Sequence, residues 1–334
     1  MLDVSFPRYV PPRRWRGGHR QTIWPSLFRT VEGVTYERER LELADGDFLD
    51  LDWMRAESAE APVAIVAHGL EGSSDRAYVR GLVRAIHRRG WSVVAWNLRG
   101  CSGEPNRLLR TYHSGVSDDL DAVVRHVLTS RVRRVAVLGF SLGGNVTLKW
   151  LGEQGEDVDD RIVAGVGISV PVDLAGSARA MEGLSRRLYM VRFLRSLTEK
   201  VHEKAMRFPG EIELAGLETM RTFAQFDGQF TAPIHGFASA EDYWARASSL
   251  PLLSEIRVPT LLVNALDDPF LSPSCYPTEI ASSSTYLTLL TPRWGGHVGF
   301  MTTGEEYWSE TVAAQFLEAA RVQRAGVGPR GDAT

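Results

Sequence analysis

Apolar residues recur along the chain in short runs separated by longer amphipathic segments. Six segments rich in Val, Ile, Leu and Ala have the length of a strand: 61–69, 90–100, 133–140, 161–171, 257–266 and 285–292. Continuous apolar runs of this length predict strands that are buried on both faces of a parallel sheet. Helical patterns follow three of these runs. They lie over residues 75–89, 117–131 and 305–324, the last of them after the final run.

Two further segments alternate apolar and polar residues, 34–43 and 48–54, around the turn sequence Ala-Asp-Gly-Asp. This pattern predicts an antiparallel hairpin. Because strands and helices alternate through most of the chain, we expect an α/β fold: a mostly parallel sheet with helices on both faces, and the hairpin as its antiparallel edge.

Residues 174–256 interrupt this alternation, since they show helical patterns and no convincing strand. Leu184, Leu188 and Val191 are spaced for one face of a helix, with arginines between them. A helical insertion over an open α/β sheet is a candidate lid. We therefore expect an N-terminal arm (1–35), an α/β core (36–173 and 257–324), a helical lid (174–256) and a disordered tail (325–334).

The composition excludes several classes of function. The chain has 334 residues, 44% of them hydrophobic, and a formal net charge of −3, so no overall basic field favours nucleic acid. No run of about 18 apolar residues predicts a transmembrane helix, and the N-terminus lacks the apolar region of a secretory signal. Two cysteines, Cys101 and Cys275, make no disulfide framework, which favours a reducing, cytoplasmic location.

Arginines gather near the N-terminus, at positions 8, 13, 14, 16 and 20. We expect a solvated arm packed over the domain. The alternative is a contact with a membrane surface, which cationic side chains favour. The sequence leaves the oligomeric state open.

One motif carries a candidate nucleophile. In Gly139-Phe140-Ser141-Leu142-Gly143, a serine stands between an apolar run and a helical pattern. This G-x-S-x-G context is typical of a nucleophile elbow, where the tight strand-to-helix turn requires small neighbours.

A serine nucleophile needs a histidine as general base and a carboxylate that orients it. In this architecture the chain order is serine, acid, histidine, with the acid after a late strand. Asp267 and Asp268 follow one late run and His297 follows the last, after Gly295 and Gly296. We predict Ser141, Asp268 and His297, preferring Asp268 because it precedes a proline and an apolar pair, and Asp267 remains the alternative.

Acyl transfer also needs donors for the oxyanion. The backbone N–H of Leu142, directly after the serine, is one candidate. Leu70, after the His68-Gly69 turn of an early strand, is the second. We expect His68 to hold that loop.

Two patterns that suggest metals are incomplete. His202-Glu203 begins like a zinc motif, but position 206 is methionine. Asp118, Asp119 and Asp121 lack the glycine and glutamate of a calcium loop. We expect neither a metal nor a cofactor.

Several blocks of the sequence resemble the YheT-like α/β-hydrolases, a branch of the abhydrolase-domain superfamily. They are "GHRQTIWPSLFR" from Gly18, "HGLEGSS" from His68, "NLRGCSGEPNR" from Asn97, "YHSG" at Tyr112, "GFSLGGN" from Gly139, "FDGQFTAPIHGFASAEDYW" from Phe226, "NALDDPF" from Asn264 and "GGHVGF" from Gly295. Arg20 departs from the apolar residue of the "GHLQT"-type family motif.

The resemblance implies hydrolysis of carboxylic esters in lipid metabolism, on short- to medium-chain acyl substrates, with the triad on Ser141, Asp268 and His297. We expect a serine esterase with a small acyl ester as its partner. One alternative is an acyltransferase that moves a medium-chain acyl group to an alcohol. Another is a non-catalytic binding protein on a hydrolase fold.

Overall fold

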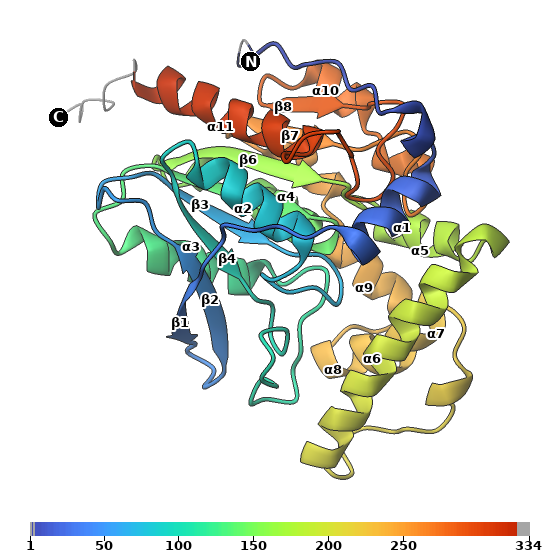
Figure 1. The fold of residues 1–334 in the computed structure, drawn as a ribbon. Coiled ribbons are helices and arrows are strands. Elements are labelled where there is room, and N and C mark those ends of the chain that lie inside the picture. Colours follow the sequence, from blue (N-terminus) through green and yellow to red (C-terminus); the bar gives the residue numbers. More distant parts are fainter. Residues whose placement is uncertain (1, 3, 326–334) are drawn as a thin grey trace.

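A twisted sheet runs through the middle of the molecule (Figure 1). The computed structural model describes residue 2 and residues 4–325, and within them the sheet has eight strands in the order β1-β2-β4-β3-β5-β6-β7-β8. The strands are β1 Glu37–Glu42, β2 Phe48–Met54, β3 Val63–Ala67, β4 Ser92–Trp96, β5 Val135–Phe140, β6 Ile162–Ile168, β7 Thr260–Val263 and β8 Leu287–Leu290. The pairs β1–β2 and β2–β4 are antiparallel and all others are parallel, which confirms the predicted edge hairpin and mostly parallel sheet.

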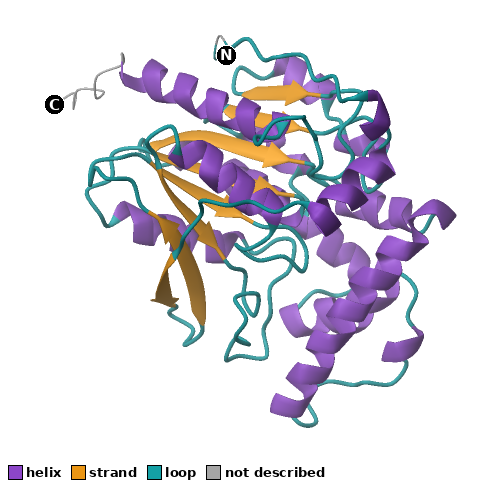
Figure 2. Cartoon of the chain, viewed as in Figure 1, coloured by secondary structure: helices purple, strands orange, loops and turns teal. Residues whose placement is uncertain are grey.

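Helices cover both faces of this sheet (Figure 2). Residues of α2 (Ala77–His87) and α11 (Trp308–Ala325) share one apolar core with one face of the strands. Residues of α3 (Ser117–Leu128), α4 (Leu142–Gln154) and α10 (Thr278–Ser283) share the core on the other face. The α/β-hydrolase fold class is therefore confirmed. The end of the tail predicted to be disordered, residues 326–334, lies outside the described residues, and Ala325 ends α11.

Residues 174–256 contain helices and no strand, and they extend away from one end of the sheet (Figure 1). Their α-helices are α5 Leu174–Met181, α6 Arg187–Arg207, α7 Phe223–Phe226, α8 Ala232–His235 and α9 Ala240–Ala247, with the short helices η3 Leu184–Arg186, η4 Leu217–Thr219, η5 Asp227–Thr231 and η6 Leu250–Glu255. The predicted apolar face of α6 is not its buried face, because Leu188 and Val191 are exposed. The buried face carries Met190, Leu194 and Val201 instead.

The N-terminal arm contains a helix that no periodic pattern predicts, α1 (Gly18–Phe28), after the short turn η1 (Arg13–Trp15). Gln21 is the one buried residue of α1, whereas the large apolar side chains of this helix are exposed. Two other short turns, η2 (Gly155–Asp157) and η7 (Pro273–Cys275), complete the helical elements of the described residues.

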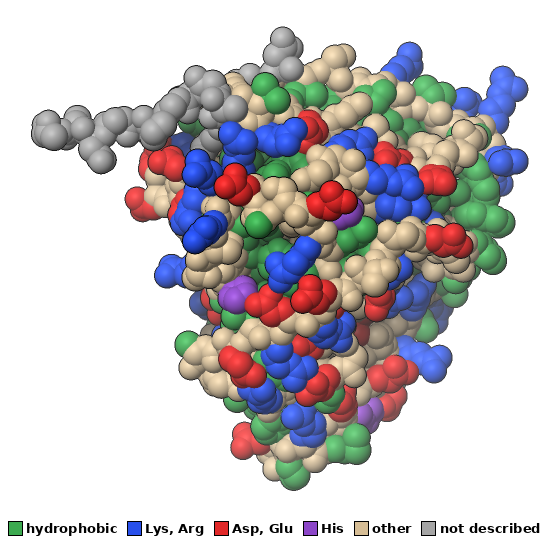
Figure 3. Space-filling model, turned by 60° about the vertical axis from the view of Figure 1, so that its left-hand side comes forward, with side chains coloured by type: hydrophobic (Ala, Val, Ile, Leu, Met, Phe, Trp, Pro, Cys, Tyr) green, Lys and Arg blue, Asp and Glu red, His purple; other side chains and the backbone are tan. Residues whose placement is uncertain are grey.

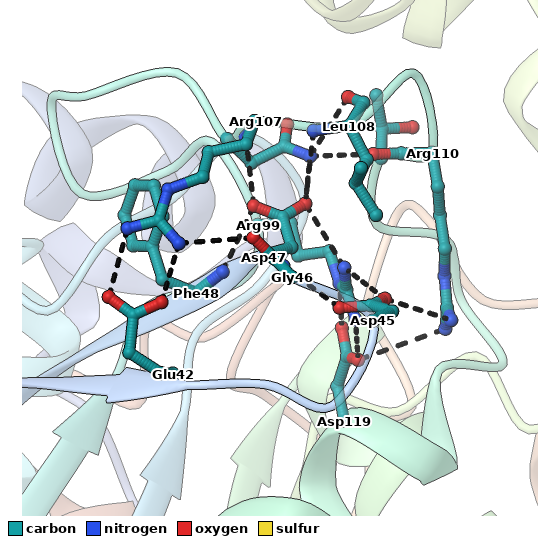
Figure 4. Close-up of polar contacts among 12 residues, drawn as sticks. Glu42, Asp45, Gly46, Asp47, Phe48, Arg99, Arg107, Leu108, Arg110 and Asp119 are labelled. Carbon is teal, nitrogen blue, oxygen red and sulfur yellow. Dashed lines mark hydrogen bonds and ion pairs between the residues drawn. The ribbon is translucent and has the colours of Figure 1, made fainter.

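A buried ionic cluster fixes the hairpin turn against the loop that follows β4 (Figure 4). The guanidinium of Arg99 donates to both carboxylate oxygens of Asp119, at 2.9 and 2.7 Å, and to Asp47 at 3.0 Å. All three side chains are at most 2% exposed. Asn106 adds a hydrogen bond of 2.6 Å to Asp47. The cluster therefore anchors residues 97–116, a loop that reaches the site described below.

We predict that Arg99→Met lowers the free energy of unfolding by about 3–5 kcal/mol, because it removes the cation that is hydrogen-bonded to two buried carboxylates and leaves Asp119 only the more distant Arg110, at 3.7 Å. Urea unfolding followed by circular dichroism measures the loss. Arg107→Met is the matched control: its ion pair with Glu42 joins side chains that are 44% and 60% exposed, so its loss should stay below about 1 kcal/mol. Equal losses in the two variants would contradict this account.

Candidate functional site

Ser141 is the single residue between the end of β5 and the start of α4. Its backbone has φ +50° and ψ −119°, a region that side chains other than glycine rarely adopt. A Cβ atom on Gly139 would lie 2.2 Å from the carbonyl oxygen of Gly143, and one on Gly143 would lie 2.4 Å from the carbonyl oxygen of His68. The corner therefore closes only with glycine at both positions.

His297 meets Ser141 from the loop after β8. Its Nε2 lies 2.9 Å from Oγ of Ser141. The backbone N–H of His297 donates to Oγ1 of Thr22 on α1, at 2.9 Å. Gly295 and Gly296 precede it with φ values of +155° and +54°, so the chain turns there in a way that favours glycine.

Asp268 lies on the other side of the histidine ring. Its carboxylate is fully buried, and its Oδ2 and Oδ1 are 2.9 and 3.2 Å from Nδ1 of His297. The N–H of Phe270 also donates to Oδ1, at 2.9 Å. A carboxylate accepts only, so Nδ1 carries the proton and Nε2 is free to accept the proton of the serine hydroxyl.

Asp267 takes a different place from its neighbour. Its Oδ1 accepts the backbone N–H of Gly296 at 2.9 Å, and burial raises the pKa of its carboxyl. The structure thus brings Ser141, His297 and Asp268 into one chain of contacts, whereas Asp267 holds the backbone of the histidine loop.

The two expected oxyanion donors border the serine. Leu70, Leu142 and Ser141 line the same cavity. Among the hydrogen bonds of the described residues, neither the N–H of Leu70 nor that of Leu142 acts as a donor, so both are available to a ligand atom.

His68 lies buried beneath this loop. The N–H of Leu98 donates to its Nε2 at 3.1 Å, which leaves Nδ1 to donate to the carbonyl of Gly69 at 2.8 Å. Burial lowers the pKa of His68 to about 4. The ring is therefore neutral near pH 7, and it connects β3 to the loop after β4.

Glu71 is a site residue that the sequence analysis missed. It has φ +54°, and its carboxylate accepts hydrogen bonds from Tyr112 and Ser196, both at 2.5 Å. Lys200 lies 3.0 Å away. Burial opposes ionisation, but the charge of Lys200 and the hydrogen bonds outweigh it and lower the pKa of Glu71. Its partners are 41 to 129 residues away along the chain, so no local pattern marks it.

Two cavities meet at Ser141 and His297. The first has a volume of about 190 Å³ and extends under the helical segment 174–256. Most of its apolar lining comes from that segment: Met181, Phe193, Leu197, Val201, Ile212, Phe223, Phe226, Phe230 and Ile234. The second, of about 260 Å³, lies between α1, the loop 69–72, the start of α2 and α6.

Burial shifts the pKa values of three titratable groups that line the first cavity, His113, Asp227 and Lys204, toward their uncharged forms. Burial lowers the pKa of His113 to about 2, and that of His235, whose ring lies beside it, to about 4. Burial raises the pKa of Asp227 to about 6, and its carboxylate accepts hydrogen bonds from Thr231 and Trp244. The cavity therefore suits an uncharged, apolar chain better than an ion.

No group of three or more His, Cys, Asp or Glu side chains within the described residues is arranged to hold a metal ion. His202 instead contacts Glu218 at 2.7 Å, and Asp118 pairs with Arg110. The same part of the chain contains no helix with the length and apolarity to cross a bilayer. Acidic and basic side chains are interspersed on the face drawn in Figure 3.

Comparison with known proteins places this geometry in a family. A family model described as alpha/beta hydrolase fold matches residues 62–302. The Escherichia coli (strain K12) protein called "Putative esterase YheT" is 39% identical over 302 residues, which are 89% of this chain and 88% of that protein. The human protein called "Phospholipase ABHD3" is 26% identical over 315 residues, 90% of this chain and 76% of its own length.

Solved structures share the fold at low sequence identity. The esterase Pf2001 of Pyrococcus furiosus superposes with a TM-score of 0.58 at 17% identity, over 95% of this chain and 99% of that one. The match over most of the core, together with the identity to the bacterial relative, shows that the chain belongs to the α/β-hydrolase fold family, in its YheT-like branch.

Proposed function

We propose that the protein is a serine hydrolase that cleaves carboxylic esters through Ser141, His297 and Asp268. The observation that carries the proposal is the unbroken series of contacts from the serine hydroxyl through both ring nitrogens to a buried carboxylate, at 2.9 and 2.9 Å. Two of its relatives are named as a putative esterase and a phospholipase, which are enzymes of the same reaction class.

The geometry supports a two-step reaction. Oγ of Ser141 attacks the ester carbonyl while Nε2 of His297 takes its proton, and the same ring then gives the proton to the departing alcohol. Asp268 stabilises the imidazolium that forms. The N–H groups of Leu70 and Leu142 bind the oxyanion, and water then releases the acid from the acyl-enzyme.

The apolar first cavity is the proposed acyl site, and the helical segment 174–256 is its lid. An alkyl chain that leaves water for this lining gains about 0.8 kcal/mol per buried methylene. The modest volume of about 190 Å³ favours short- to medium-chain acyl groups. The second cavity takes the alcohol, since it opens at the same serine and histidine.

That second cavity also favours a second candidate function. An acyltransferase needs a space beside the acyl-enzyme where an alcohol replaces water, and a cavity of about 260 Å³ borders Ser141. Product analysis of a turnover mixture that contains ethanol separates the two, because transfer yields an ethyl ester and hydrolysis yields the free acid.

We expect Ser141→Ala to lose at least about 10³-fold in kcat, because the nucleophile is absent. Initial rates on p-nitrophenyl esters from acetyl to palmitoyl, with the wild type alongside, measure this and locate the chain-length optimum. A serine-directed fluorophosphonate should label the wild type alone. Equal rates and no labelling would favour a non-catalytic binding protein.

Asp268→Asn should lower kcat by about 10⁴-fold, since an amide no longer fixes the tautomer of His297 or stabilises its charge. Asp267→Asn is the matched control, because its side-chain oxygen still accepts the N–H of Gly296; we expect less than about a tenfold loss. Steady-state kinetics on one ester, with thermal melts to verify folding, make the comparison. A larger loss in Asp267→Asn would reverse the assignment.

Leu197→Trp should move the optimum to shorter acyl chains, because the added ring occupies part of the first cavity. Met206→Trp changes the same helix at a side chain that is 76% exposed and lines neither cavity, so its optimum should match that of the wild type. The chain-length profile of kcat/KM is the measurement. An unaltered profile in Leu197→Trp would place the acyl chain elsewhere.

A further inference from the structure

Exposed apolar side chains gather on α1 and on the start of the helical segment. Thirteen large apolar side chains are exposed in the described part of the chain, and seven of them lie on these two segments. They are Ile23 (42%), Trp24 (44%), Leu27 (60%), Phe28 (61%), Leu184 (90%), Leu188 (82%) and Val191 (53%). Patches of this kind mark a surface that meets a partner.

The two segments lie side by side. The ring of His19 on α1 stacks on that of Tyr189 on α6, with centroids 5.7 Å apart and planes at 10°, and their polar atoms are 3.1 Å apart. Both helices line the second cavity, through Ile23 and Leu27 on one side and through Tyr189 and Arg192 on the other. We call residues 13–28 and 184–192 the mouth rim.

The mouth rim is cationic and has no acidic counterpart. Residues 4–31 and 183–198 contain no Asp or Glu. Six exposed arginines lie within the rim, and none of them has an ion-pair partner among the described residues: Arg13, Arg14, Arg16, Arg20, Arg187 and Arg192. Guanidinium groups bind phosphate oxygens through paired hydrogen bonds, so this surface suits an anionic partner.

Aromatic rings lie within the same surface. The ring of Trp24 is 4.6 Å from that of Trp15 and 4.4 Å from that of Phe28. Indole rings favour the boundary between water and hydrocarbon, since they are apolar with one polar edge. Apolar side chains, indoles and unpaired arginines together match the chemistry of a phospholipid surface.

We propose that the mouth rim docks on an anionic phospholipid bilayer. Leu184, Leu188, Trp24 and Phe28 enter the interface, and the arginines contact the phosphate groups. A second copy of the chain is a poorer occupant, because it would bring two acid-free, arginine-rich surfaces together.

Docking in this orientation turns the second cavity toward the bilayer. An ester dissolved in the lipid then reaches Ser141 without crossing water. That consequence rests on the proposed function, whereas docking itself does not.

The test uses full-length Ser141→Ala, so that binding is measured without turnover. Co-sedimentation with vesicles of phosphatidylcholine alone, or mixed with phosphatidylglycerol, gives the partition. We expect binding to the anionic vesicles that weakens as salt is raised. In this background, Leu184→Ser/Leu188→Ser and Arg16→Glu/Arg187→Glu should each lower the partition by at least about tenfold.

Matched controls lie elsewhere on the surface. Val322→Ser removes an apolar side chain that is 67% exposed on α11, and Arg131→Glu/Arg133→Glu reverses two exposed arginines after α3. Both should bind like the parent. With Ser141 restored, the rim variants should hydrolyse water-soluble p-nitrophenyl acetate like the wild type, which separates docking from catalysis.

Three outcomes would overturn the proposal. The first is that the parent protein does not co-sediment with anionic vesicles at low salt. The second is an equal loss of binding in the control variants. The third is a dimer in sedimentation analysis that the rim substitutions dissociate, which would assign the surface to a second copy.

Discussion

The site depends on one close contact between two backbone segments. The corner after β5 packs so tightly on the loop after β3 that a Cβ atom at position 143 would clash with the carbonyl oxygen of His68. This contact holds Ser141 in a strained conformation and keeps Leu70 and Leu142 beside it. Parallel pairing of β3 with β5 supplies the alignment, because it ends both strands at the same edge of the sheet.

Three segments far apart in the sequence then fix the loops around that corner. Thr22 on α1 holds the backbone of His297, Asp267 holds that of Gly296, and Glu71 ties the loop after β3 to Ser196 and Lys200 on α6. Glu71 follows Leu70 directly. A movement of α6 would therefore act on the backbone next to a proposed oxyanion donor, which couples the helical segment to the reaction centre.

Local patterns in the sequence predicted the elements whose buried side chains recur with the period of a strand or a helix. The buried strands, the edge hairpin and the helices on both faces follow from apolar runs and turn residues, and the order of Ser141, Asp268 and His297 follows from the places where strands end. The helix α1 could not be predicted this way, because it buries Gln21 and exposes Trp24 and Phe28. Glu71 escaped notice because all its side-chain contacts are distant in sequence.

The contact between Thr22 and His297 also shows that the part of the chain that supports the site includes the N-terminal arm. The range that the family model matches, residues 62–302, contains Ser141, Asp268 and His297, yet the backbone N–H of His297 donates to Thr22, which lies outside that range. The arm is thus a structural part of the histidine loop, added from beyond the sheet. A fragment or chimaera that is cut at residue 62 would separate His297 from Thr22. The arm and the core must therefore be exchanged together.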